Sequence, residues 1–297
     1  MKTIWIRVLQ VMALWALVQP AGAQQPSAAA PHPPLWKIEG KRATVFLLGS
    51  VHLLTPADYP LAAPIEAAFD RAKVVAFEAD LASLNSPQLQ AKVMTNMMLP
   101  AGQTIRDQLS PKLYDQLVPQ LKATGLPLEA VERMKPGMLG MTLSMMELQK
   151  TGLDEKLGVD RHFYERAGKA GKETMGLEAA EFQVDLICSL SKEEGEALLA
   201  GLLKELPRMK EELDRLMQAW RKGDIKTTAE LLNSALAEHP GLYKRFVQDR
   251  NLRWLPKVEE LIRGDRDALV IVGTGHLAGK ESLVELLQHK GIKVTQQ

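Results

Sequence analysis

The chain has 297 residues, of which 46% are hydrophobic and 25% are charged, and its formal net charge is +1. This composition is typical of a globular protein, and the length suits one large domain or two small ones. The nearly neutral charge gives no basic field for nucleic acid, and no nucleic-acid-binding motif is present, so nucleic acid is excluded as a partner. Cys188 is the single cysteine, which excludes an intramolecular disulfide.

The first 23 residues have the three parts of a secretory signal peptide. Lys2 and Arg7 precede an apolar stretch at Val8–Val18, and Ala21–Ala23 form a small-x-small cleavage motif. The apolar stretch is short for a membrane span. We therefore predict cleavage after residue 23, no stable membrane span, and a periplasmic or secreted location in a bacterium. An uncleaved N-terminal anchor is the alternative.

Residues 24–34 are mainly Ala, Pro, Ser and Gln, and we expect a disordered tether there. The folded domain is expected over residues 35–297. It begins with a predicted strand at Leu35–Ile38, which pairs with a second apolar strand at Ala43–Leu48 across a turn. The second strand runs into the sequence Gly-Ser-Val-His, which ends at His52.

The next elements predict a parallel sheet. A helix around Ile65–Ala72 is followed by a buried strand at Val74–Phe77, which ends at Glu78. This strand–helix–strand order is typical of βαβ units. The fold class predicted is therefore α/β, with a mostly parallel or mixed sheet and flanking helices.

The middle of the chain predicts a large helical insertion at about residues 86–170. Residues Asn96–Pro100, Ser110–Thr124 and Met138–Lys150 carry apolar side chains at helical spacing, and methionines are frequent among them. Methionine fills irregular gaps in a core, so soft helix packing is the ordinary explanation. A groove for an apolar ligand or peptide is the alternative.

A further strand at Glu173–Leu177 ends at Glu178, and a helical segment follows at about residues 191–264. Leu269–Val272 then form an apolar run that leads into Gly-Thr-Gly-His, ending at His276. A helix at Lys280–Gln288 and a final strand at Ile292–Val294 complete the predicted domain. The pattern of an apolar strand followed by Gly-x-x-His thus occurs twice.

Four polar side chains follow predicted strands: His52, Glu78, Glu178 and His276. The carboxyl ends of parallel strands meet at one edge of the sheet, where open α/β proteins build their sites. Imidazole and carboxylate ligands together suit a transition metal that activates water. Without a metal, a histidine beside a carboxylate acts as a general base.

These motifs, in this order, resemble the TraB/PrgY/GumN group, which is related to the Tiki metalloproteases. The resemblance implies an erythromycin-esterase-like or ChaN-like α/β core, in which the Gly-x-x-His histidines and a glutamate after the second strand form the active site. The matching positions are Leu48–His52, Phe77–Glu78, Lys135–Pro136, Gly158–Asp160, Gly176–Glu178, Arg250–Asn251 and Gly273–Leu277.

By this resemblance, His52, His276 and Glu78 are expected to bind a divalent transition metal (Mn, Co or Zn), with Glu78 as a ligand or as the general base. Glu178, like Asp160, is expected to orient the histidines or to serve as a cap. Arg250 either holds a substrate anion or pairs with a pocket acid.

The expected function is that of an exported, metal-dependent hydrolase that acts on a peptide or a small-molecule substrate, with peptide bonds as the first expectation. A non-catalytic protein that sequesters a peptide or a haem-like ligand is the alternative. A metal-free esterase with His52 or His276 as its base is the third interpretation.

Overall fold

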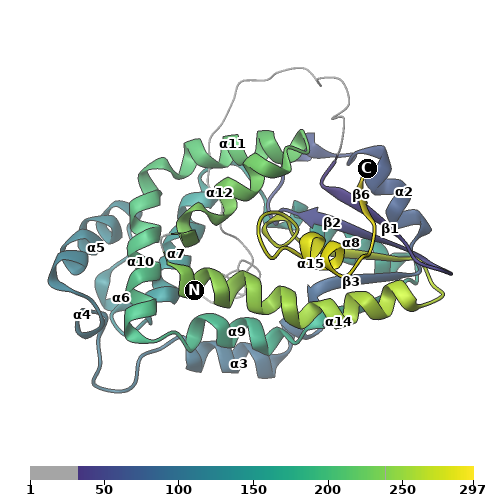
Figure 1. Cartoon of the computed structure of the whole chain (residues 1–297). Helices are drawn as coiled ribbons and strands as arrows, with labels where there is room; N and C mark the ends of the chain where they lie inside the picture. The colour runs from purple at the N-terminus through teal and green to yellow at the C-terminus, as the bar shows by residue number, and fades with distance from the viewer. Residues whose placement is uncertain (1–32, 238) are drawn as a thin grey trace.

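The computed structural model describes residues 33–237 and 239–297, so the predicted signal peptide and most of the predicted tether lie outside the described residues. The described residues form an α/β fold around one six-stranded sheet, in the order β4-β3-β5-β2-β1-β6. The predicted α/β class with a mixed sheet is confirmed. Figure 1 shows the sheet at one end of the molecule and a large group of helices extending from it.

The strands are β1 (Leu35–Glu39), β2 (Thr44–Ser50), β3 (Val74–Ala79), β4 (Glu173–Glu178), β5 (Ala268–Gly273) and β6 (Val294–Gln296). The predicted hairpin is present, because β1 pairs antiparallel with β2. The pairs β2–β5, β5–β3 and β3–β4 are parallel, and β6 pairs antiparallel with β1. The last parallel strand therefore lies between the first two, which brings the two Gly-x-x-His motifs to adjacent strands.

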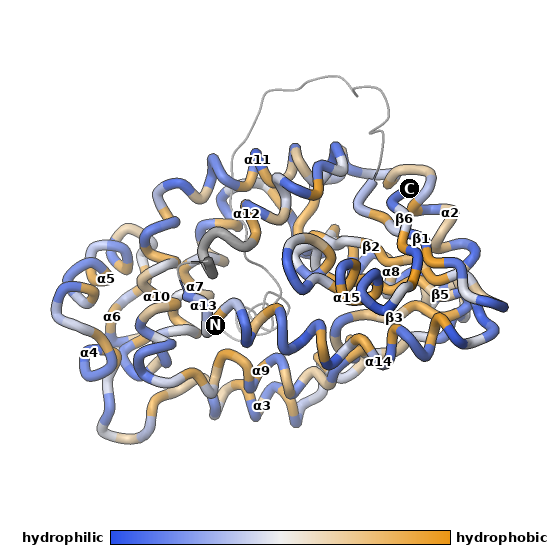
Figure 2. The backbone as a smooth tube through the Cα atoms, viewed as in Figure 1, coloured by the Kyte–Doolittle hydropathy of each residue, from blue (hydrophilic) through white to orange (hydrophobic). Residues whose placement is uncertain are grey.

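Each face of the sheet is covered by helices. Successive side chains of a strand point to opposite faces, and those of the central strands are apolar on both faces. One face packs Phe46, Phe77 and Ile271 against helices α2 (Ala63–Arg71) and α8 (Val159–Lys169). The other face packs against α14 (Asp249–Arg263) and α15 (Leu283–His289). In Figure 2 the central strands are largely orange, while α11 and α14 alternate between blue and orange along their length. The sheet is thus the middle layer of three.

Two short helices, η1 (Pro56–Asp58) and η6 (Thr274–His276), follow β2 and β5, and, apart from α2 and α15, the other helices lie between β3 and β5. Before β4 these are η2 (Ser83–Asn85), α3 (Pro87–Asn96), α4 (Ile105–Gln108), α5 (Pro111–Thr124), α6 (Leu128–Val131), α7 (Pro136–Gln149), η3 (Glu155–Leu157) and α8. After β4 they are α9 (Ala180–Cys188), α10 (Lys192–Glu205), η4 (Leu206–Arg208), α11 (Met209–Arg221), α12 (Ile225–Ala237), α13 (Pro240–Tyr243), the π-helix η5 (Lys244–Gln248) and α14.

One predicted helix is absent, and the predicted starts of two elements near the end of the chain, a helix and a strand, are wrong. Residues 96–100 are not a helix, because α3 ends at Asn96 and Met98 forms a β-bridge with Met134. The proline at position 100 disfavours helical backbone in the residue before it. Near the end of the chain, α15 begins at Leu283, and β6 begins at Val294 rather than at residue 292.

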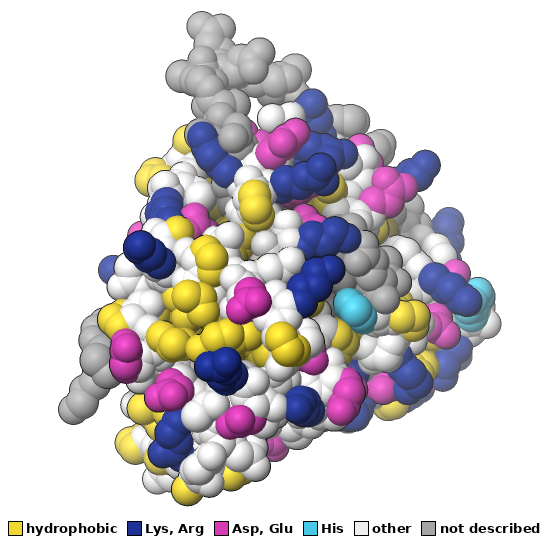
Figure 3. Space-filling view, turned by 90° about the vertical axis from the view of Figure 1, so that its left-hand side faces the viewer, with side chains coloured by type: hydrophobic (Ala, Val, Ile, Leu, Met, Phe, Trp, Pro, Cys, Tyr) yellow, Lys and Arg dark blue, Asp and Glu magenta, His cyan; other side chains and the backbone are white. Residues whose placement is uncertain are grey.

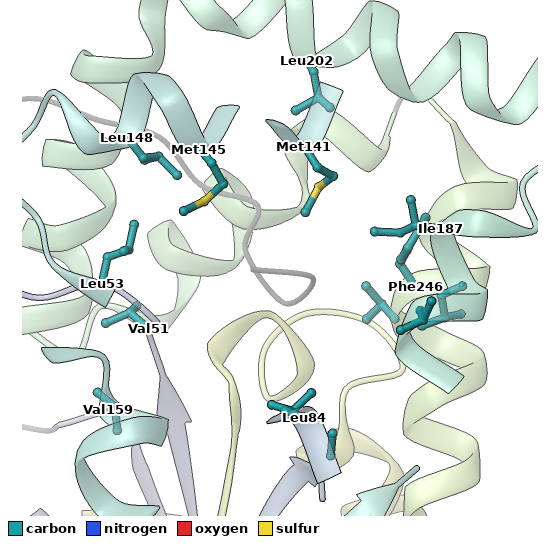
Figure 4. Close-up of a cluster of buried hydrophobic side chains, with 14 of the residues drawn as sticks. Val51, Leu53, Leu84, Met141, Met145, Leu148, Val159, Ile187, Leu202 and Phe246 are labelled. Carbon is teal, nitrogen blue, oxygen red and sulfur yellow. The ribbon is translucent and has the colours of Figure 1, made fainter. Parts of the chain in front are cut away.

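Helix α7 is buried on nearly every side. Ten buried side chains from several elements, labelled in Figure 4, belong to one contact cluster. They are Val51, Leu53, Leu84, Met141, Met145, Leu148, Val159, Ile187, Leu202 and Phe246.

The outer surface mixes both signs of charge. Figure 3 views the end of the molecule that carries α4, α5 and α6, and shows acidic and basic side chains around a group of apolar side chains. This pattern agrees with the formal net charge of +1. Within residues 33–237 and 239–297, no helix is both long and apolar enough to cross a membrane.

Candidate functional site

The two Gly-x-x-His motifs pack directly against each other. β2 and β5 are parallel neighbours, with Ser50 opposite Gly273. A Cβ atom at Gly49 would lie 2.8 Å from the Thr274 hydroxyl oxygen, so only glycine allows this approach. The Thr274 hydroxyl in turn donates to the carbonyl of Ser50 at 3.0 Å. The repeated motif therefore predicted correctly that distant segments meet at one edge of the sheet.

His52 is held at one nitrogen and free at the other. Its Nδ1 lies 2.6 Å from Oδ2 of Asp160, and the Ser50 hydroxyl donates to Oδ1 of the same carboxylate at 3.1 Å. Its Nε2 is buried and has no hydrogen-bond partner among the described residues. Burial alone would lower the pKa of His52, but the Asp160 carboxylate outweighs it and raises that pKa. The ring thus presents one nitrogen for chemistry.

Helix α8 brings Asp160 to His52 through a very close backbone contact. A Cβ atom at Gly158 would lie 2.3 Å from the His52 carbonyl oxygen, so the helix can begin there only with glycine. The amide of Val159 donates to the carbonyl of Val51 at 3.0 Å. Asp160 lies in the first turn, where a carboxylate is favourable.

Glu78 is buried within β3, and donors hold both of its oxygens. Its Oε1 accepts from the Gly273 amide at 2.6 Å, and its Oε2 accepts from Nη2 of Arg250 at 2.6 Å. Burial would raise the pKa of Glu78. The nearby Arg250, His276 and His52 instead lower it to about 2, with help from the Gly273 amide. Glu78 is therefore a carboxylate at neutral pH.

Arg250 occupies the centre of the site, and all of its N–H groups face protein acceptors. Nη2 lies 2.5 Å from Glu178 as well as 2.6 Å from Glu78, and Nε donates to Glu178 at 3.1 Å. Nη1 faces Nε2 of His276 at 3.1 Å and the Phe246 carbonyl at 3.4 Å. This is the ion pair with pocket acids that the sequence left open. A substrate anion would have to displace one of these acceptors.

Glu178 is placed beside this guanidinium by further donors. Its Oε2 accepts from the indole of Trp254 at 2.9 Å, and its Oε1 accepts from the amide of Gln183 at 3.0 Å. Glu178 thus anchors Arg250 and does not contact His52 or His276 by hydrogen bond. Trp254 is thus fully buried and takes part in the network through its indole.

The tautomer of His276 follows from its two neighbours. A guanidinium only donates, so Nε2 of His276 must accept from Arg250. Nδ1 therefore carries the proton and donates to Oδ1 of Asn251 at 2.8 Å. Burial, with the charge of Arg250, lowers the pKa of His276 to about 3. His276 is neutral at physiological pH, and both of its nitrogens are engaged.

Two of the predicted metal ligands lie close together, since His276 Nε2 lies 3.9 Å from Glu78 Oε1. Among the described residues, however, no three His, Cys, Asp or Glu side chains are arranged to hold a metal ion. Of the three predicted ligands, only His52 has a ring nitrogen without a hydrogen-bond partner among the described residues, so this set does not fit a shared metal in this arrangement. The shared metal stays a prediction.

Ser50 is a site residue for which the sequence analysis predicted no role of its own, although it lies within the first motif. Its hydroxyl contacts Asp160, and its position two residues before the histidine in the first Gly-x-x-His motif was the available signal. Serine is common in loops, so composition alone does not distinguish this role.

The sheet and the site define an α/β protein with paired acidic and basic groups buried at the carboxyl edge of its parallel strands. The chain belongs to the TraB/PrgY/gumN family, whose model matches residues 34–296. It is 24% identical over 242 residues to "Uncharacterized protein YbaP" of Escherichia coli (strain K12). The aligned residues cover 82% of this chain and 87% of that protein. The protein of the same name from Shigella flexneri matches to the same extent. No solved structure matches this chain significantly.

Proposed function

We propose that this chain is an exported hydrolase of peptide bonds in which water is activated at Nε2 of His52. The observation that carries the proposal is the state of this imidazole. Asp160 fixes one nitrogen at 2.6 Å, and the other is buried without a partner among the described residues. A general base needs this combination of a fixed ring and a free acceptor.

In the proposed reaction, Nε2 removes a proton from water as the water attacks the carbonyl carbon. The Asp160 carboxylate stabilises the imidazolium that forms, in line with the raised pKa of His52. The imidazolium then gives its proton to the leaving amine. Because only the neutral ring is a base, the rate is expected to rise with pH until His52 is fully deprotonated.

Arg250 and its partners act as positioning residues in this proposal. The guanidinium holds Glu78 at 2.6 Å and the neutral ring of His276 at 3.1 Å. This network keeps the second Gly-x-x-His motif against the first one. Its substitution is expected to lower activity through the geometry of the site.

Metal-dependent hydrolysis is the second candidate, and the charge of the site favours it. The site holds three carboxylates, because Asp160 pairs with His52 while Glu78 and Glu178 pair with the one guanidinium, that of Arg250. A divalent cation such as Mn, Co or Zn would offset this excess of negative charge. For His276 to be a ligand, Arg250 would first have to leave its Nε2.

The test is a digest of a peptide library by the purified chain, with His52→Gln and Asp160→Asn as variants. His52→Gln is expected to lower kcat/KM by about 10²–10⁴-fold, the usual contribution of a general base. The exposed His289→Gln on α15 is the matched control and should cleave normally. Cleavage by His52→Gln at the rate of the unaltered chain would rule out the assignment.

Chelation separates the two candidates. Full activity in excess EDTA supports direct base catalysis, whereas loss of activity that added Mn²⁺, Co²⁺ or Zn²⁺ restores supports the metal-dependent form. A chain that cleaves nothing but carries a bound peptide, or a haem absorption band, supports the sequestering alternative. Export is tested by the N-terminus of the protein recovered from the periplasm or medium, which should be Gln24.

A further inference from the structure

We infer that Ser50 is a positioning residue of this site, whose hydroxyl orients the Asp160 carboxylate and, through it, the imidazole of His52. The inference rests on the proposed function, because it adds a third residue to the pair that would activate water. Three features of the described residues support it: the separate partners of the two Asp160 oxygens, the burial of the contact, and the anchoring of the Ser50 backbone.

The two oxygens of Asp160 have different partners. Oδ1 accepts from the Ser50 hydroxyl at 3.1 Å, while Oδ2 lies 2.6 Å from Nδ1 of His52. A carboxylate that is bonded at one oxygen only can turn about its Cβ–Cγ bond, because this torsion is soft. The bond from Ser50 opposes that rotation, so Oδ2 stays at Nδ1 and the ring keeps Nε2 for water.

Burial makes this contact costly to lose. Ser50 is 2% exposed and Asp160 is 9% exposed, so bulk water does not replace a lost donor. A buried carboxylate oxygen without a donor costs free energy, which favours its movement toward another donor. Without the Ser50 hydroxyl, Asp160 is therefore expected to leave Nδ1 of His52 for part of the time.

The backbone on each side of this contact is anchored. The carbonyl of Ser50 accepts from the Thr274 hydroxyl at 3.0 Å, which ties the serine to the second Gly-x-x-His motif. The carbonyl of Val51 accepts from the amide of Val159 at 3.0 Å, at the start of the helix that carries Asp160. Donor and acceptor are thus held by separate elements, and the serine joins the second motif to the histidine–aspartate pair.

The same geometry favours positioning over attack on the substrate by the serine itself. A nucleophilic serine is hydrogen-bonded to its base. The Ser50 hydroxyl instead donates to Asp160, and Nε2 of His52 has no hydrogen-bond partner among the described residues. Ser50 therefore acts on His52 through the carboxylate.

The experiment compares Ser50→Ala with Ser50→Thr, which keeps a hydroxyl at this position, on the peptide that the unaltered chain cleaves best. Ser50→Ala is expected to lower kcat by about 10–100-fold with little change in KM, because a displaced base slows the reaction without weakening binding. Ser50→Thr is expected to keep most of the kcat. Ser144→Ala is the matched control, since this buried serine has no hydrogen-bond partner among the described residues, and it should cleave normally.

A second measurement does not depend on turnover. The nitrogen chemical shifts of the His52 ring give the populations of its two tautomers when the ring is neutral, and His52→Gln assigns the signals. The unaltered chain, Ser50→Thr and Ser144→Ala are expected to show only the tautomer protonated at Nδ1, whereas Ser50→Ala is expected to show both. Circular dichroism confirms that the variants are folded.

The two measurements separate the inference from the proposed function. A single tautomer in Ser50→Ala would overturn the inference whatever the change in kcat, because the serine would then not act through His52. Both tautomers in the unaltered chain would overturn it as well. If the unaltered chain cleaves no peptide, the proposed function fails, and the tautomers alone decide whether Ser50 orients the pair.

Discussion

At the level of single residues, the pair Asn251 and His276 shows how a neutral histidine is made. Nδ1 of His276 donates to Asn251, while Nε2 accepts from Arg250. Protonation would place a second cation against the guanidinium in a buried site, which is why the pKa of His276 falls to about 3.

The variant Asn251→Asp is therefore expected to raise the pKa of His276, because a carboxylate at Nδ1 favours the protonated ring. The rise should be about 1–3 units, the usual effect of one close opposite charge. Nuclear magnetic resonance titration of the ring protons measures it. The control Asn96→Asp adds the same charge at the end of α3, outside the network, and should leave the titration unchanged. An unchanged titration in Asn251→Asp would show that Asn251 does not set the state of this ring.

At the level of elements, the start of α8 is the contact that assembles the proposed base. The helix meets the chain after β2 so closely that a Cβ atom at Gly158 would lie 2.3 Å from the carbonyl of His52. Any larger residue must push the helix away and take Asp160 with it.

Gly158→Val is expected to lower the free energy of unfolding by about 1–3 kcal/mol, the usual effect of overpacking. It should also lower the pKa of His52, because the distance to Asp160 increases. Gly168→Ala is the matched control within the same helix, since a Cβ there meets nothing within 4 Å. That control should be neutral or more stable by about 0.5–1 kcal/mol. Urea unfolding measures both, and equal stabilities would contradict the role given to Gly158.

The elements also show why parts of the fold were predictable from sequence. Residues in β2, β3 and β5 form continuous apolar runs, since both faces of the sheet are covered, and such runs predict buried parallel strands. Helix α7 is buried nearly all round, so its apolar residues show no clear face. The sequence therefore did not predict which elements α7 packs against. Some helix boundaries could not be predicted because they depend on contacts that are distant in the sequence. After α3 ends at Asn96, for example, Met98 forms a bridge with Met134.

The site was predictable only in part, because its contacts are long-range. The Gly-x-x-His motif indicated His52 and His276, and strand ends indicated Glu78 and Glu178. Arg250 bonds to both of these glutamates and to His276 because of the way α14 crosses the sheet. No local sequence pattern predicts that crossing. The position of β5 between β2 and β3 is equally a property of the whole sheet.

At the level of the whole molecule, the buried network makes folding stability depend on pH, and the two histidines act with opposite signs. The folded pKa of His276 is about 3, below its ordinary value of 6.5. The stability it contributes is complete above pH 6.5 and is lost as pH falls toward 3, because the unfolded chain binds the proton first. Glu78, with its pKa lowered to about 2, adds to this loss below about pH 4.5. The raised pKa of His52 means that its contribution is complete below pH 6.5 and is lost as pH rises through the folded value.

The chain is therefore expected to lose stability between pH 6.5 and 4.5 with a slope of up to about 1.4 kcal/mol per pH unit from His276 alone. His276→Gln should flatten this slope, whatever its effect on stability at pH 7, because it removes the group that titrates in the unfolded chain. The unaltered chain should lose the contribution of His52 as pH rises through the raised pKa of that ring, and His52→Gln should not show this loss. His289→Gln, at an exposed position, serves as the control. Urea unfolding at half-unit steps of pH gives the three slopes. If His276→Gln and the unaltered chain lose stability in parallel from pH 6.5 to 4.5, then His276 is not held neutral by Arg250, and the network is arranged differently in solution.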